Sequence, residues 1–483
     1  MMKKKNKKKK RKIENTLAIF TNAADPSLQY FKDPTNTPII QSARNFFAST
    51  RFNLDIPYQV HLGPTEGWRS VAKLAVRGSS RVEDNNRIVT NKSIGLFGAN
   101  SHIIIPCLNS PVHHPAINIV GKIVEEGCVV NKITGYREAT DSGLIRYLLL
   151  SVELSSNKVQ VTFVVNQMPA DGIPGCLQQL IDWLSTGKKR SRQIHSIWVH
   201  FHPTSIQMHS GIAGKHNNSI TSRIDDSWLH VHGERMLRLQ MNLQGHGEMA
   251  MDGGIVDVNT EANIVDSAEK IGKKRKRKIY SDAGEDSHKA VIPKLCFPPN
   301  VFRQSNFDGF SRIVSSLRKY IPKKSKVIEL YGGVGTIGLQ LTDLVKRLEC
   351  SDENPYNVDC FERSLSDFIA ERGEEKYRRR IKYIHSSAAD RAVAPGGFEG
   401  FDLLLVDPPR KGLDEEVITA LCQAPAPMKR LVYVSCGFKA FMSNCDQLLL
   451  SGWSLIHAEG HVLFPGSDHI ETLAIFDRAV DRT

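Results

Sequence analysis

The stretch KVIELYGGVGTIG, residues 326–338, decides how the C-terminal half of this chain folds. Its first five residues place apolar side chains around one glutamate and predict a short buried strand. Glycines end that strand, and Gly333, Gly335 and Gly338 form the pattern G-x-G-x-x-G. Such a pattern lets the backbone approach a ligand closely where a strand turns into a helix. We therefore predict a ligand-binding turn here, followed by a helix over residues 336–348.

Strand-like and helix-like segments alternate from residue 293 onward. Further strands are predicted at residues 347–352, 381–387, 401–409 and 430–436, and helices at 357–373, 415–424 and 439–452. This alternation indicates a parallel sheet covered by helices on both faces. Residues 455–479 have the pattern of two strands without a long helix between them, which predicts an antiparallel hairpin. A mostly parallel sheet with one reversed strand at its end is the layout of class I (Rossmann-like) methyltransferases, an α/β fold.

The chain is long enough for two or three domains, at 483 residues. We predict a basic, disordered tail over residues 1–45 and a polar, disordered insertion over 246–292. Between them, residues 46–245 are predicted to form a β-rich or α+β domain, because period-two alternation recurs along them. Residues 293–483 form the predicted catalytic domain.

The net charge of +13 is concentrated in two short tracts. Residues 1–12 carry nine Lys/Arg, and residues 273–278 read KKRKRK. Together these tracts exceed the whole net charge, so the remainder of the chain is not basic. Such tracts are typical of nucleic-acid tethers and of nuclear-import signals, and a solvated tail is an equal alternative for each.

The nine cysteines are scattered along the chain and never form a C-x-x-C pair. This pattern argues against a disulfide framework and an iron–sulfur site, so we predict a reducing compartment and no metal. No apolar run approaches the roughly 18 residues that a membrane span needs. We therefore expect no membrane association and a cytoplasmic or nuclear location, with an organelle as an open alternative.

Two acidic residues end predicted strands at the edge where ligands of such sheets bind. Asp352 follows the first glycine of the turn by about 20 residues, the spacing expected of a carboxylate that binds ribose hydroxyls. Capping the helix that follows is the alternative role, and both roles could coexist. Asp407 precedes Pro408 and Pro409, which form a rigid turn that would fix its carboxylate. The glycine turn alone suits a nicotinamide cofactor as well as S-adenosylmethionine, whereas the second motif is not needed by nicotinamide enzymes.

Cys436 ends the fifth predicted strand, at that same edge. A helix predicted to begin just after it would lower the pKa of its thiol. A thiolate that adds to C6 of uracil makes C5 nucleophilic toward a methyl sulfonium. The C5 proton must then leave to a general base on the other side of the ring. Glu471 in the last hairpin is the candidate proton acceptor, and His469 is the competing one.

Four motifs in this order resemble the RNA (uracil-5-)-methyltransferases, which make 5-methyluridine in tRNA or rRNA. They are ELYGGVGTIGL, VDPPRKGLD, YVSC and FPGSDHIE, within residues 329–471. VFRQSN, residues 301–306, resembles the family's F-x-Q-x-N motif, and residues 63–78 resemble its more N-terminal domain. The resemblance covers most of residues 60–480.

The resemblance implies roles for individual residues. Cys436 would be the nucleophile and Glu471 the proton acceptor. The cofactor S-adenosylmethionine would lie against Gln304, Tyr331, Thr336, Asp352 and Asp407. The substrate would be a uridine in tRNA or rRNA, flipped or in a loop, and no obligate protein partner is expected.

Two alternatives stay open from the sequence. The first is a methyltransferase-fold protein that binds RNA without catalysis. It is favoured by Gly437 and Phe438 where the family often has Asn-Pro, and by an altered loop at residues 465–471. The second is a nicotinamide-dependent enzyme, which depends on the glycine turn alone.

Overall fold

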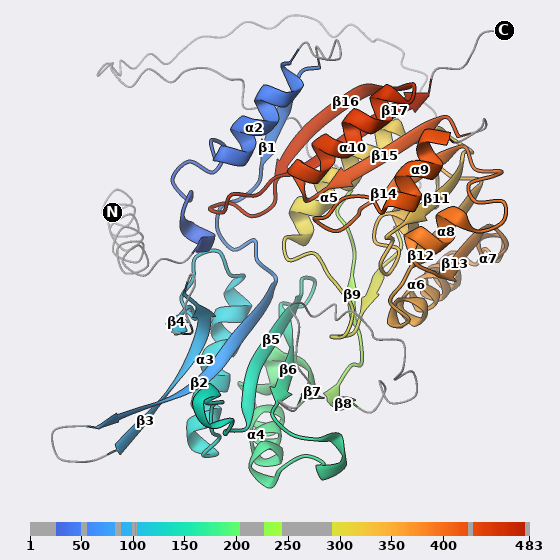
Figure 1. The fold of residues 1–483 in the computed structure, drawn as a ribbon. Helices are drawn as coiled ribbons and strands as arrows, with labels where there is room; N and C mark the ends of the chain where they lie inside the picture. Colours follow the sequence, from blue (N-terminus) through green and yellow to red (C-terminus); the bar gives the residue numbers. More distant parts are fainter. Residues whose placement is uncertain are drawn as a thin grey trace, which may run out of the picture.

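The computed structural model describes residues 26–49, 56–82, 88–98, 102, 104–202, 227–243, 292–423 and 428–478. Within these residues the chain forms two sheet-based bodies, which lie one above the other in Figure 1. We call the eight-stranded sheet with its helices the C-terminal domain, and the seven-stranded sheet with its helices the central domain. The C-terminal part of the prediction is confirmed: it is an α/β fold built on a mostly parallel sheet.

The eight-stranded sheet has the order β1-β16-β17-β15-β14-β11-β12-β13. Only β17 runs against its neighbours, β15 and β16. As predicted, the last two strands form an antiparallel hairpin. The strands are β1 (Gln59–Leu62), β11 (Lys326–Leu330), β12 (Arg347–Asp352), β13 (Ile381–His385), β14 (Leu403–Val406), β15 (Arg430–Ser435), β16 (Trp453–Val462) and β17 (Glu471–Arg478).

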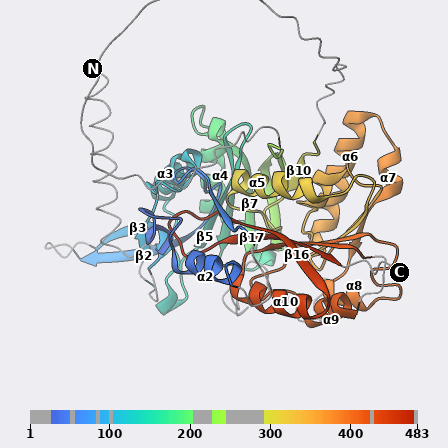
Figure 2. The ribbon, with the colours of Figure 1, turned by 90° about the horizontal axis from the view of Figure 1, so that it is seen from above.

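Helices cover both faces of this sheet, as Figure 2 shows from above. Successive strand residues alternate between the two layers: Val327 packs in one core and Ile328 in the other. One face carries α5 (Phe307–Leu317), α6 (Tyr356–Arg372) and α7 (Lys376–Arg380). The other carries α2 (Pro38–Phe47), α8 (Ala388–Val393), α9 (Glu415–Gln423) and α10 (Phe438–Leu450).

The central domain is a seven-stranded sheet of order β4-β3-β2-β5-β6-β7-β8. Only β6 and β7 pair in parallel, and helix α4 connects them. The apolar sides of helices α3 and α4 pack against this sheet in one core. The elements are β2 (Val71–Val82), β3 (Ile88–Phe97), β4 (Ile104–Pro106), α3 (Pro115–Val130), β5 (Ile145–Glu153), β6 (Lys158–Val165), α4 (Gly175–Thr186), β7 (Ile194–Phe201) and β8 (Trp228–Gly233).

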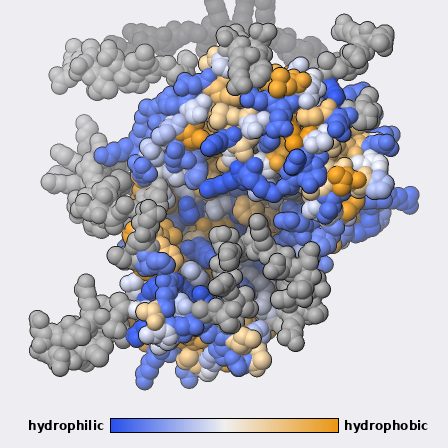
Figure 3. Space-filling model, viewed as in Figure 1, coloured by the Kyte–Doolittle hydropathy of each residue, from blue (hydrophilic) through white to orange (hydrophobic). Residues whose placement is uncertain are grey.

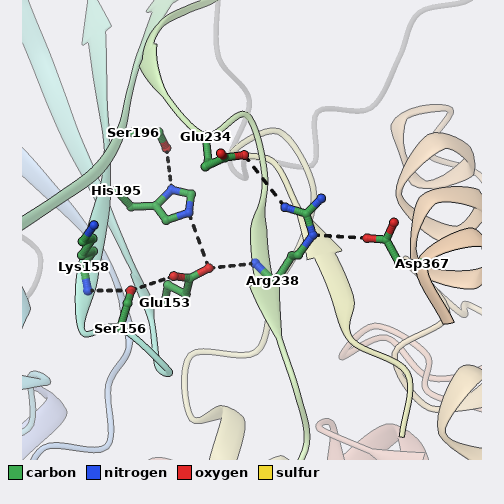
Figure 4. A network of polar contacts seen from close by, with 8 residues as sticks. All are labelled: Glu153, Ser156, Lys158, His195, Ser196, Glu234, Arg238 and Asp367. Carbon is green, nitrogen blue, oxygen red and sulfur yellow. Dashed lines mark hydrogen bonds and ion pairs between the residues drawn. The ribbon is translucent and has the colours of Figure 1, made fainter. Parts of the chain in front are cut away.

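A two-stranded ladder joins the two domains: β9 (Leu237–Leu239) pairs with β10 (Leu295–Phe297). Arg238 lies at the centre of the polar network of Figure 4. Its Nε is 3.2 Å from Asp367 of α6, and its backbone N–H donates to Glu153 of β5 at 3.3 Å. Glu153 also faces His195 of β7, at 3.5 Å. Arg238 therefore connects the end of β5 in the central domain to helix α6 of the C-terminal domain.

The N-terminal boundaries differ from the prediction. Residues 26–45 were expected within the tail, yet α2 (Pro38–Phe47) buries Ile40, Ala43 and Phe47 against the C-terminal domain. Strand β1 pairs in parallel with β16 and so belongs to that domain rather than to the β-rich one. The reversed strand β17 lies inside the sheet, since β16 and β1 continue beyond it. Almost all of the predicted insertion, and both basic tracts, lie outside the described residues.

The helix predicted over residues 336–348 is wrong. The structure has turns and a short 3-10 helix, η8 (Gly338–Leu341), in which all four residues are buried. The apolar spacing reflects burial on all sides rather than one helical face. Other short 3-10 helices are η1 (Pro26–Leu28), η3 (Glu138–Thr140), η4 (Pro169–Asp171), η5 (Ser191–Gln193) and η7 (Arg318–Tyr320). Every helix among the described residues is too short or too polar to span a bilayer.

Candidate active site

Three predicted site residues meet at the carboxyl edge of the eight-stranded sheet. Asp407 directly follows β14, and Cys436 directly follows the parallel neighbour β15. Glu471 is the first residue of β17, which runs the opposite way. Because Ser435 pairs with Thr472, the next position along the ladder sets Cys436 beside Glu471. The sheet register thus brings together a thiol and a carboxyl that are far apart in the sequence.

Close backbone packing holds the loops that carry these groups. The Sγ atom of Cys436 lies 3.8 Å from the carbonyl oxygen of Pro408. A Cβ atom on Gly437 would lie 2.2 Å from the carbonyl oxygen of Arg410, so only glycine fits there. The Arg410 guanidinium in turn reaches Nε2 of His469 at 3.3 Å. The loops after β14 and β15 and the loop before β17 therefore form one packed unit.

The thiol and the two carboxyls all have their neutral forms favoured. Burial raises the pKa of Glu471 to about 8; the neighbouring Asp407 raises it further and Arg410 opposes the shift. Burial likewise raises the pKa of Asp407 to about 7. The pKa of the Cys436 thiol rises to about 12, through burial first and then through Glu471 and Asp407. Asp407 thus opposes ionisation of both Glu471 and Cys436, Glu471 also opposes ionisation of Cys436, and the Arg410 cation favours the charged forms of both.

The expected lowering of the thiol pKa by a helix is not found. Helix α10 does begin at Phe438, directly after Cys436 and Gly437, as predicted. Burial and the two carboxyls outweigh the field of its first turn. The thiol is consequently protonated near neutral pH, and a reaction partner that enters the site must draw the proton away. Glu471 and Asp407 titrate in the range where side chains exchange protons efficiently at neutral pH.

The glycine turn of residues 331–338 lies over a buried carboxylate that the sequence analysis did not single out. Glu329 of β11 accepts hydrogen bonds from the Gly338 N–H, at 3.1 Å, and from the Cys350 thiol, at 2.8 Å. Burial raises the pKa of Glu329 to about 7. A Cβ on Gly338 would lie 2.2 Å from Oε2 of Glu329. The only signal in the sequence was one acidic residue inside an otherwise apolar strand.

The backbone of Gly333 is fixed at both of its peptide groups. Its N–H donates to Oδ2 of Asp352 at 3.0 Å, and its carbonyl accepts from the Tyr383 hydroxyl at 2.9 Å. Its φ of +55° suits glycine. A Cβ there would meet nothing nearer than Oγ1 of Thr336, at 4.0 Å. The turn therefore leaves open space directly beside Gly333.

Comparison with known proteins identifies the family. No family model matches the chain. The chain is 30% identical over 462 residues to an uncharacterized RNA methyltransferase of Protochlamydia amoebophila, which covers 95% of this chain and 96% of the relative. The chain belongs to the RNA methyltransferases. The aligned region includes both domains, so the similarity to this relative is not confined to the C-terminal sheet.

Two further similar proteins have names that specify the methylated base, but one aligns with a smaller part of this chain and the other has a lower sequence identity. A tRNA (uracil(54)-C(5))-methyltransferase of Pyrococcus furiosus is 29% identical over 187 residues, 39% of this chain and 41% of that one. The crystal structure of a Pyrococcus abyssi tRNA (uracil-54, C5)-methyltransferase with S-adenosyl-L-homocysteine superposes with a TM-score of 0.55. That structure is 17% identical and covers 90% of this chain and 81% of the other, so it shows a shared fold.

The other residues predicted to line the cofactor pocket of the methyltransferase differ from one another in burial and in hydrogen bonding. Gln304 and Thr336 are half-buried, and neither side chain hydrogen-bonds to another described residue. Asp352 serves its own chain too: Oδ1 accepts from the Asn354 N–H at 2.9 Å. The hydroxyl of Tyr331 is bound within the chain. It donates to Asp414 at 3.0 Å and accepts from the Asp414 N–H at 3.1 Å.

Three aromatic residues differ in whether they could stack on an RNA base. Trp68 and Phe201 are core residues, 7% and 5% exposed. Phe302 is 72% exposed and lies two residues before Gln304. Of these three, only Phe302 is open to a base. Figure 3 shows a mostly hydrophilic surface on this side of the methyltransferase, with apolar residues scattered across it.

Proposed function

We propose that this RNA methyltransferase transfers a methyl group from S-adenosylmethionine to C5 of a uridine in tRNA or rRNA. The observation that carries the proposal is the β15–β17 register, which sets Cys436 beside Glu471 with Asp407 on the adjacent strand. A thiol and a proton acceptor on either side of one planar ring are what a C5 methylation requires. The names of the Pyrococcus relatives support the same substrate base.

In this proposal Cys436 acts first. Its sulfur adds to C6 of the uracil, the proton of the thiol leaves to a neighbouring acceptor, and C5 becomes nucleophilic. The bound methyl donor supplies an electrophilic methyl group at that carbon. Glu471 then takes the C5 proton, and the electrons of the broken C–H bond restore the C5–C6 double bond as Cys436 departs. Cys436 departs as a thiolate and takes back its proton from the first acceptor, and Glu471, which must be ionised to accept the C5 proton, releases that proton to water. Each group thus ends in the state in which it began.

The crowded acids explain how Cys436 stays inactive until RNA enters. Its thiol has a raised pKa while Glu471 and Asp407 face it. A flipped uracil placed between the thiol and the carboxyls would separate these acidic groups and offer its N3–H to Asp407. Because C5 and C6 of a stacked base are out of reach, the uridine must be flipped or lie in a loop.

The cofactor site is proposed at the glycine turn. Thr336 offers an unused hydroxyl within the turn, Gln304 would reach the cofactor from the loop before α5, and Asp352 would accept from ribose hydroxyls. The Asp352 carboxylate can accept about four hydrogen bonds. It accepts three within the chain, from Gly333, Asn354 and Asn357. Tyr331 would contribute through its backbone and ring, since its hydroxyl is held by Asp414.

Labelled methyl donor and unmodified RNA transcripts test the proposal. Wild type is expected to place the label in 5-methyluridine, as measured by nucleoside mass spectrometry. Cys436→Ala should abolish the product. Cys422→Ala, which changes a half-buried cysteine on α9, is the matched control and should leave it intact. RNA binding by wild type without any methyl transfer would favour the alternative, a methyltransferase-fold protein that only binds RNA.

A further inference from the structure

Imidazole and carboxylate side chains gather on one face of the sheet where β1 meets β16. The stretch HAEGH of β16 places His457, Glu459 and His461 at alternate positions, and alternate residues of a strand share a face. His61 of β1 pairs in register with His461, so its side chain lies on that face too. The His61 and His461 rings stack with their centroids 4.8 Å apart. Two strands that are remote in the sequence thus supply one cluster.

The donor atoms of three of these residues converge. Oε1 of Glu459 lies 2.9 Å from Nε2 of His461, and Oε2 lies 3.5 Å from Nε2 of His61. One ligand atom from each residue falls within 4.8 Å of the other two. A tetrahedral zinc ion with bonds of about 2.0–2.2 Å separates its ligand atoms by about 3.3–3.5 Å. The cluster therefore needs only small side-chain adjustments to surround an ion.

The burial of the cluster also favours a cation. Glu459 is 6% exposed and His461 is 4% exposed. A buried carboxylate is costly unless a charge or hydrogen bonds compensate it. Nε2 of His61 is itself buried and makes no hydrogen bond. His457 is the fourth neighbour, with Nε2 3.1 Å from Oε2 of Glu459.

We propose that His61, Glu459 and His461 bind a divalent transition-metal ion, with zinc as the best match to two imidazoles and one carboxylate. Histidine and carboxylate are zinc's usual nitrogen and oxygen ligands, and three protein ligands leave a fourth position for water. His457 would orient the carboxylate from outside the ligand set. Because β1 is only four residues long, the ion would fasten it to β16 just before the chain enters the central domain.

This site is independent of the proposed methyl transfer. His461 pairs in register with Glu471 on the neighbouring strand, yet neither Glu471 nor Cys436 is a ligand. The competing account needs no metal: His461 Nε2–H would simply donate to Glu459, and the cluster would be a hydrogen-bonded network. The two accounts make opposite predictions for the metal content of the purified protein.

Metal analysis of the full chain, with any histidine tag removed, decides between them. After chelator treatment, reconstitution with Zn²⁺ and desalting, wild type should retain a single zinc per chain by plasma mass spectrometry. Reconstitution with Co²⁺ should give visible absorption bands of a low-coordinate site. Wild type that retains no zinc and shows no such bands would overturn the proposal.

Substitutions locate the ion. His61→Gln should lose the zinc, and because His61 is partly exposed this variant should still fold. His385→Gln, on the exposed edge of β13, is the matched control and should retain it. Zinc should raise the thermal midpoint of wild type and of His385→Gln, but not of His61→Gln. Equal retention by both variants, or an equal thermal shift, would show that the ion is bound elsewhere and would overturn the assignment.

Discussion

Cys436 and Glu471 occupy surroundings that oppose the charged form of each. Both are removed from water, and Asp407 adds a further negative charge next to them. These residues could be predicted from the sequence because strand ends are easy to locate and the chemistry at a strand end restricts the residue types. Their raised pKa values could not be predicted, since they depend on packing between three loops. Glu329 was missed for the same reason: only the folded turn gives it a role.

Replacing Glu471 should separate the two halves of the proposed reaction. In Glu471→Gln the thiol can still add and the methyl group can still transfer, but the C5 proton has no acceptor. Turnover should fall on the order of 10²–10⁴-fold, and a covalent protein–RNA complex should accumulate with ordinary uridine RNA, visible on a denaturing gel. Glu416→Gln, at the start of α9, is the control. Loss of turnover without any covalent complex would argue against Glu471 as the acceptor.

The raised pKa of Glu471 also predicts how stability depends on pH. Between its ordinary value of 4.5 and about 8, the folded protein holds a proton that the unfolded chain has lost. Stability contributed by this group therefore falls as pH rises through that window. The urea midpoints of wild type and Glu471→Gln should therefore change differently with pH. From pH 5 to pH 8 the midpoint of the variant should rise relative to that of wild type. A constant difference between them would contradict the shift.

At the scale of elements, the buried strands were predictable and two helical segments were not. Buried parallel strands such as Leu403–Val406 show as short apolar runs between polar turns. Residues 336–348 show apolar residues at helical spacing, yet residues 338–341 are enclosed on all sides and form a short 3-10 helix. Helix α2 was hidden behind a lysine-rich tail, and its partners Phe438 and Phe441 lie hundreds of residues away. Long-range packing, not local pattern, decides these cases.

The glycine turn gives a test at the same scale. A methyl group at Gly338 would lie 2.2 Å from Glu329 and 2.7 Å from the Cys350 sulfur. Such overpacking typically costs about 1–3 kcal/mol, so Gly338→Ala should lower the urea midpoint and weaken binding of the methyl donor. At Gly175, which begins α4, an added Cβ meets nothing within 4 Å, so Gly175→Ala serves as the matched control. Equal stability of the two variants would show that the carboxylate beneath the turn can move aside.

At the scale of the whole molecule, the two densest runs of positive charge are residues 1–12 and 273–278. Together they carry 15 Lys/Arg against a net charge of +13, and both lie outside the described part of the chain. A separate cationic segment offers phosphate binding without reading sequence. The two domains meanwhile are joined through Arg238 and the β9–β10 ladder. Recognition of the target uridine and general affinity for RNA would then reside in different parts of the molecule.

Removing the first tract tests that division. Replacing the nine Lys/Arg of residues 1–12 with glutamine keeps the length of the chain and removes its charge. RNA affinity at low salt should fall, and the dependence of the affinity on salt should become shallower, because fewer counterions are released. The rate of methyl transfer at saturating RNA should stay unchanged. An unaltered salt dependence would exclude phosphate binding by this tract.

The most direct test of the account is covalent trapping by RNA that contains 5-fluorouridine. Fluorine at C5 cannot be removed as a proton, so addition by Cys436 followed by methyl transfer leaves an adduct that cannot break down. Wild type with methyl donor is predicted to yield a denaturant-resistant protein–RNA complex that maps to Cys436, and Cys422→Ala should yield it too. Wild type that methylates ordinary uridine RNA at C5 but never forms this complex would contradict the account.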